Sequence, residues 1–99
     1  MSRWQEVDRL ISEDKFQAAL EGAETLRREA QEAGDAEEWT RGLIKETQLR
    51  SGLHGYETAV RFLRDQEWPE APKHQLILGL FYGRTLAHYL RAYHWEIQR

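Results

Sequence analysis

The segment from Leu76 to Ile97 constrains the fold most, because apolar residues recur along it at helical spacing in three directions. The first series contains Leu76, Leu80, Gly83, Ala87, Leu90 and Ile97, interrupted by His94. The other two contain Tyr82, Leu86, Tyr89 and Tyr93, and Ile77, Phe81 and Trp95. A helix that is apolar on most sides is surrounded by other helices. We therefore predict that this segment is the central helix, with Leu80 and Leu90 in the core.

The length and charge of the chain restrict its class. Its 99 residues fit one domain, residues 1–99, and 17 acidic residues are interspersed with 14 basic ones. Because no basic stripe is present, the pattern argues against a nucleic-acid partner. The absence of cysteine excludes disulfides. The longest apolar run, Leu76–Tyr82, is far shorter than the roughly 20 residues that span a bilayer, so we predict no membrane insertion.

Start and stop signals divide the rest of the chain into four further helices. The expected helices cover residues 2–11, 15–33, 36–52 and 56–63, and the last helix runs from about Lys73. Asp14 and Asp35 are expected N-caps, and Gly34 is suited to the left-handed position after a helix. Two prolines place an irregular connection between Asp65 and Pro72.

An internal repeat is visible at a spacing of 40 residues. Phe16, Ala19, Leu20 and Ala23 correspond to Tyr56, Ala59, Val60 and Leu63 at this spacing, and Trp4 corresponds to Trp39, which follows it by 35 residues. Aromatic and small residues at fixed offsets are typical of helical-hairpin repeats, and the pattern resembles tetratricopeptide repeats. It departs from them because the first helix of the second unit is longer. The predicted fold is all-α: five helices, forming two tetratricopeptide-like antiparallel hairpins plus a long C-terminal helix.

No arrangement of residues predicts a reaction. The four histidines, His54, His74, His88 and His94, lack the spacing of three or four that places two metal ligands on one helix face. No nucleophile motif or phosphate-binding loop is present. We therefore predict no catalytic, cofactor-binding or metal-binding residues, although an enzyme of unknown type remains an alternative. Gly79 and Gly83, with Ala87, form a small-residue stripe suited to close packing of a helix, from this chain or from a partner.

Two segments carry a resemblance to a known family. HGYETAVRFLRDQEWPE and LFYGRTLAHYLRAYHWEIQR resemble the N-terminal helical region of bacterial alpha-2-macroglobulin-like proteins. Tyr89, Tyr93, Trp95, Ile97 and Arg99 stand at matching places, whereas His94 occupies a place where the family pattern has arginine. The resemblance implies a module of a cell-envelope protease trap, in the periplasm or cell envelope. The thioester of that family needs a cysteine, so no trapping residue is carried over to this chain.

Two hypotheses about function remain. In the first, the chain is a non-catalytic interaction or scaffolding module, a fragment of a larger chain whose next domain covers the uncapped helix end near Ile97. In the second, it is a small, cytoplasmic adaptor or regulatory protein that forms a homodimer through its last helix. The expected partner-binding face is Tyr82, Leu86, Tyr89 and Tyr93.

Overall fold

The protein consists of five helices joined by short connections. The computed structural model describes the backbone of residues 3–97 and the side chains of residues 3–94. The helices are α1 (Trp4–Ser12), α2 (Phe16–Ala33), α3 (Ala36–His54), α4 (Tyr56–Asp65) and α5 (Pro72–Ile97). The prediction of an all-α fold with five helices is confirmed.

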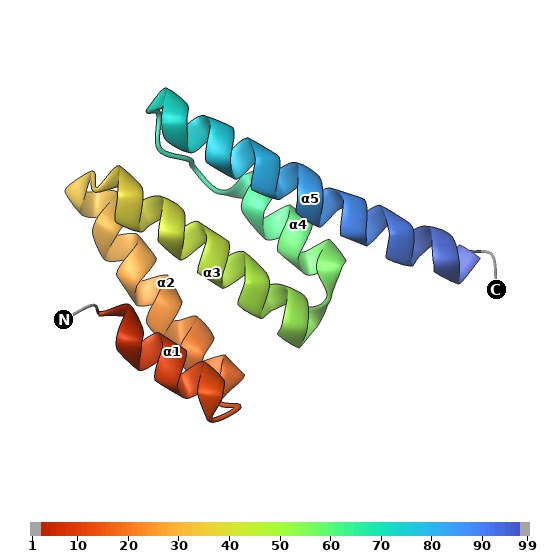
Figure 1. Ribbon diagram of the computed structural model, residues 1–99, viewed down its shortest axis with the longest axis horizontal. Coiled ribbons are helices and arrows are strands. Elements are labelled where there is room, and N and C mark those ends of the chain that lie inside the picture. Colours follow the sequence, from red (N-terminus) through yellow and green to blue (C-terminus); the bar gives the residue numbers. More distant parts are fainter. Residues whose placement is uncertain (1–2, 98–99) are drawn as a thin grey trace.

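The helices lie side by side and alternate in direction, as Figure 1 shows. Each helix packs against the next along the chain, and α5 also contacts α3. The molecule measures 47 × 35 × 17 Å, so its shortest dimension is little more than one helix diameter of about 10–12 Å. In so thin an arrangement, a helix at the edge has neighbours on one side only. α5 lies at the edge opposite α1.

The helix ends follow the signals of the sequence at most positions. The backbone N–H of Glu38 donates to the side chain of Asp35, which is the N-cap of α3 as predicted. Gly34 ends α2 with φ of 71°, also as predicted. Asp14 is not an N-cap: it adopts a left-handed φ of 60°, and Lys15 occupies the N-cap position of α2. The expected start of α1 at residue 2 lies outside the described residues.

The core has two parts. One is formed mainly between α1 and α2, and it contains Trp4, Val7, Ala19, Leu20, Ala23 and Leu49. The other joins α3, α4 and α5 through Leu43, Leu63 and Leu78, with aromatic residues around them. The α4–α5 connection is fixed by two hydrogen bonds, because Trp68 donates to the carbonyl of Leu63 and Gln75 donates to that of Pro69.

Residues that the sequence repeat matched have similar environments in the structure. Ala19 and Ala59 are fully buried, and their neighbours Leu20 and Val60 are buried as well. The aromatic residues that lead the two helices, Phe16 and Tyr56, are both exposed. These equivalent burials explain the aromatic–small–aliphatic order in α2 and α4.

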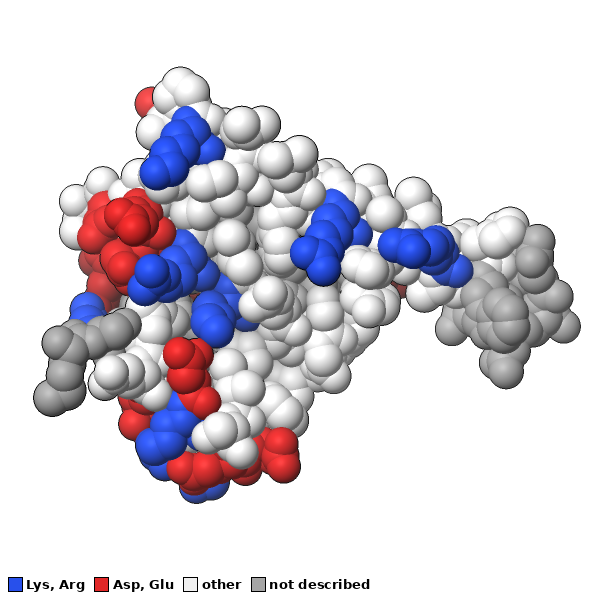
Figure 2. Space-filling model, in the orientation of Figure 1, with Lys and Arg blue, Asp and Glu red and all other residues white. Residues whose placement is uncertain are grey.

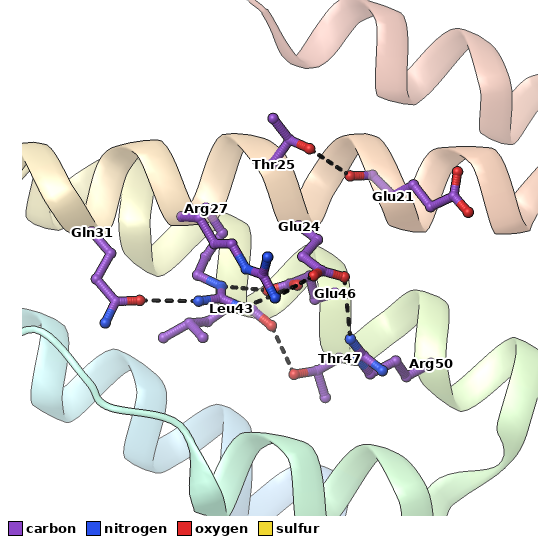
Figure 3. A network of polar contacts seen from close by, with 10 residues as sticks. Glu21, Glu24, Thr25, Arg27, Gln31, Leu43, Glu46, Thr47 and Arg50 are labelled. Carbon is purple, nitrogen blue, oxygen red and sulfur yellow. Dashed lines mark hydrogen bonds and ion pairs between the residues drawn. The ribbon is translucent and has the colours of Figure 1, made fainter.

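A buried ion pair connects α2 to α3. Nε of Arg27 donates to a carboxylate oxygen of Glu46 at 2.8 Å, and both side chains are shielded from solvent. Figure 3 shows this pair inside a network in which Arg27 also donates to Gln31. Burial raises the pKa of the Glu46 carboxyl, and the guanidinium of Arg27 opposes that effect. The network was not predicted from the sequence.

Gly42 allows α2 and α3 to approach closely beside this ion pair. A Cβ atom at position 42 would lie only 2.5 Å from Cβ of Arg27, well inside any real contact. The missing side chain at position 42 therefore lets the stem of Arg27 pack against the backbone of α3. The guanidinium then reaches Glu46 one turn further along the helix.

The prediction that the last helix is central and surrounded is wrong. The inner side of α5 is buried through Leu78 and Thr85, but Leu76, Leu80 and Leu90 on the other side are 64%, 67% and 52% exposed. Leu80 and Leu90 are therefore not core residues. Helical spacing identified the apolar series correctly, but it did not determine which series packs against the body. The part of the first series at Ile97 lies outside the described side chains.

We expect leucine substitutions on the two sides of α5 to change the free energy of unfolding by different amounts. Leu78→Ala should lower the free energy of unfolding by about 2–5 kcal/mol, because Leu78 is fully buried. Leu80→Ala and Leu90→Ala should change it by less than about 0.5 kcal/mol, because those side chains already contact solvent. Urea unfolding of the three variants measures the difference. A loss of more than about 2 kcal/mol for Leu80→Ala would contradict the arrangement of α5.

We also expect the Arg27–Glu46 pair to behave as a buried ion pair. Glu46→Ala should destabilise the protein by about 3–5 kcal/mol, because it leaves the guanidinium of Arg27 buried without its carboxylate. The double variant Arg27→Met with Glu46→Leu should recover most of that loss, because no buried charge remains. Urea unfolding of the single and double variants forms the test. An equal loss of stability in Glu46→Ala and in the double variant would contradict the description of Arg27 and Glu46 as a buried ion pair.

Candidate interaction surface

The side of α5 that points away from the body is apolar and uncovered. We call it the outer face. It consists of Leu76, Gly79, Leu80, Gly83, Ala87 and Leu90. All six are exposed, and they recur at steps of three and four, so they form one continuous stripe along the helix. Exposed single leucines are ordinary, whereas a contiguous apolar stripe over four turns marks an interaction site.

The two glycines of the outer face are not explained by packing within the described part of the chain. A Cβ atom added at Gly79 or Gly83 would meet nothing within 4 Å. Gly42 differs, because Arg27 occupies the space that its side chain would need. Each glycine in a helix interior lowers stability by about 1 kcal/mol relative to alanine. Gly79 and Gly83 therefore weaken α5 without improving a contact of the described residues.

Basic residues line one rim of the outer face. Lys73, Arg84 and Arg91 are exposed, and their separations of 11 and 7 residues place them on the same side of the helix. In Figure 2 the surface over α5 is largely uncoloured, with separate basic groups along it. Acidic side chains are instead concentrated over the other end of the molecule in that view. The opposite rim of the outer face carries Leu86 and Tyr93, of which Tyr93 is 53% exposed.

The face predicted from the sequence, Tyr82, Leu86, Tyr89 and Tyr93, faces partly toward the body. Tyr82 packs against the second core part and meets Trp68 edge-on, with ring centroids 6.2 Å apart. Leu86 and Tyr89 are half-buried, and Tyr89 stacks on the exposed ring of Tyr93. A binding role for these four residues stays a prediction. Most residues of the outer face were identified in the sequence as the first apolar series, but the helix that carries them was expected to be enclosed.

The histidines are dispersed. His74 contacts the hydroxyl of Thr40 at 3.1 Å, and His88 stacks on Tyr56 with ring centroids 5.8 Å apart. His54 and His94 are exposed. Among the described residues, no three histidine or acidic side chains gather into a possible metal site. The predicted absence of metal and of catalytic residues stays a prediction.

Several hollows of the surface lie away from the outer face, and two of them border charged or aromatic side chains. One of about 590 Å³ opens between α2 and α3, and its charged residues Arg3 and Glu29 form an ion pair, as do Arg41 and Glu38. A smaller one of about 230 Å³ lies beside the Tyr56–His88 stack, below the roughly 300 Å³ of typical ligand pockets. The outer face is the more distinctive feature, because its exposed leucines and glycines form one continuous stripe.

Comparison with protein-family models, with curated proteins and with solved structures gave no match for this chain. Within the described residues, no helix combines the length and the apolar content that crossing a membrane requires.

Alanine substitutions test which glycines are needed for packing within the chain and which have open space beside them. Gly79→Ala and Gly83→Ala should each raise the free energy of unfolding by about 0.5–1 kcal/mol, because alanine favours the helix and its Cβ meets nothing. Gly42→Ala should instead destabilise the protein, because its Cβ would overlap the stem of Arg27. Urea unfolding of the three variants measures both signs. Destabilisation by Gly83→Ala would mean that position 83 is not free.

Proposed function

We propose that this chain is a non-catalytic helical interaction or scaffolding module that binds protein through the outer face of α5. The observation that carries the proposal is the combination of three exposed leucines with two helix-interior glycines that have open space beside them. Large apolar side chains supply contact area, and glycines permit a close approach of a second helix. The glycines weaken an isolated helix and the exposed leucines promote association, whereas both are useful at an interface.

The shape of this surface favours a protein partner over a small molecule. Small-molecule sites are concave and enclose most of their ligand, whereas the outer face is one side of a helix at the edge of the molecule. The fitting partner is a helix or another flat apolar element, in the manner of helix pairs and helix-in-groove complexes. The basic rim of Lys73, Arg84 and Arg91 then borders the contact.

Two finer statements belong to the same proposal. The matched burial of Ala19 with Ala59, and of Leu20 with Val60, supports the description of the two hairpins as tetratricopeptide-like repeats. The resemblance of residues 54–70 and 80–99 to bacterial alpha-2-macroglobulin-like proteins supports a place as the N-terminal helical part of such a protease trap. In that version of the proposal, a neighbouring domain would cover the outer face.

Site-specific photo-crosslinking tests the proposal. A photoreactive phenylalanine analogue placed at Leu80 or Leu90 in cells that make the protein should give discrete protein adducts, because both positions lie in the outer face. The same analogue at Gln17, exposed on α2, is the matched control and should give few. Mass spectrometry then identifies what is attached. Adducts at Gln17 alone, or none at either α5 position, would contradict the proposal.

A further inference from the structure

The outer face, taken together with Leu86 on its rim, has a sequence order that is symmetric about Gly83 at three spacings. Leucines stand seven residues on either side, at Leu76 and Leu90. Small residues stand four away, at Gly79 and Ala87, and leucines stand three away, at Leu80 and Leu86. An amphipathic helix needs apolar residues at such spacings, but it does not need the two members of all three pairs to match in size. The symmetry therefore carries information about what covers the outer face.

We propose that the outer face binds a second copy of this chain, with the two α5 helices antiparallel and a two-fold axis beside Gly83. This inference rests on the proposed function and names its partner. A two-fold contact uses the same surface on both copies, and here it makes the two helices run in opposite directions. A residue that precedes Gly83 in one copy therefore lies at the same height along the helix pair as the residue that follows Gly83 by the same number of positions in the other copy. A sequence symmetric about Gly83 is complementary to itself under that operation.

The symmetry also places large residues against small ones. Leu76 of one copy lies level with Leu90 of the other, and both point close to the centre of the contact. Leu80 lies beside Ala87 of the second copy, and Leu86 lies beside Gly79 of the second copy. Leucine against glycine or alanine lets the two helices interdigitate, and Gly83 on the axis lets their backbones approach. The open space beside Gly79 and Gly83 is then filled by the second copy.

The position of α5 in the fold permits this contact. The buried side of α5, at Leu78 and Thr85, faces α3 and α4, while the outer face points away from them. Two copies joined through their outer faces would therefore place their bodies on opposite sides of the helix pair. In Figure 1 the described part of the chain places no other helix beyond α5 on its free side.

The expected affinity is modest. The contact from Leu76 to Leu90 extends over roughly 21 Å of helix, given a rise of 1.5 Å per residue. One helix pair of this length buries less than the roughly 1,200 Å² of a standard stable interface, so we expect a dissociation constant no tighter than about 1 µM. The dimer should therefore depend on protein concentration.

The basic rim predicts the salt dependence of the dimer. The two-fold axis places the basic rims of both copies on the same side of the helix pair. Arg84 therefore comes near Arg84 of the second copy, and Lys73 comes near Arg91 of the second copy. These repulsions between exposed cations are screened within about 10 Å at 0.1 M salt. Association should therefore become stronger as salt is added. An acidic partner on the same rim would show the opposite trend, which makes salt a test of the occupant.

Disulfide trapping tests the symmetry, and the absence of native cysteine makes it selective. Gly83→Cys alone should form a covalent dimer under mild oxidation, because position 83 meets its own copy within the roughly 7 Å Cα separation that a disulfide needs. Leu76→Cys and Leu90→Cys should cross-link rapidly when mixed and slowly when separate. Glu32→Cys, exposed on α2, is the control for random collision. Faster cross-linking of Leu76→Cys with itself than with Leu90→Cys would overturn the antiparallel arrangement.

Sedimentation equilibrium on the unmodified chain tests whether the dimer exists. A concentration series reaching the millimolar range should show a monomer–dimer equilibrium that shifts toward dimer with added salt. Leu80→Glu should abolish it, and Gln17→Glu, with the same added charge on α2, should leave it unchanged. A monomer at all concentrations and salt levels overturns the inference. Photo-crosslinks from Leu80 to a different protein, with no dimer in solution, would exclude the second copy while the proposed function stands.

Discussion

The close contact between α2 and α3 is the interaction on which the rest of the structure depends. Within the described residues these two helices share the most extensive contact, and each also packs on the other helices of its own half: α2 on α1, and α3 on α4 and α5. The contact depends on Gly42, because a side chain there would displace Arg27 and the ion pair to Glu46. A buried ion pair adds little net stability, but it tolerates few alternative registers between the two helices. The pair therefore fixes how the two halves of the core are aligned.

The sequence predicted the elements better than it predicted their packing. Helix limits at Gly34, Asp35 and Pro72 follow from local chemistry, namely capping, left-handed backbone and the fixed φ of proline, and the structure agrees. Burial in α5 depends instead on what α3 and α4 present. Trp39 of α3, Phe62 of α4 and Trp68 of the α4–α5 connection surround Leu78, and the more regular leucine series lies outside. Periodicity locates an apolar face, but it contains no information about which partner is nearest.

The buried ion pair was missed for a related reason. Arg27 and Glu46 lie in helices that are rich in both charges, so composition alone does not distinguish them from the charged residues of solvated faces. The signal that could have found Arg27 is its register: it lies on the same side of α2 as Ala23 and Ala30, which are buried. A charged residue within a series of alanines faces a neighbouring helix and needs a partner there. The candidate interaction surface was missed differently, since its residues were found but were expected to be enclosed.

The thin shape of the molecule joins these observations to function. The position of α5 at the edge of the molecule gives it one covered side, and this side holds the bulky residues Leu78, Phe81 and Tyr82, which suit a wide separation from α3 and α4. The uncovered side alternates leucine with glycine and alanine, which suits a narrow separation from another helix. A helix that had only to finish this fold would gain stability from alanine at positions 79 and 83, and polar residues at 76 and 80 would keep its surface from associating. The chain has glycine and leucine at these positions instead, and this difference supports the proposal that the outer face serves a contact that the described part of one copy does not make.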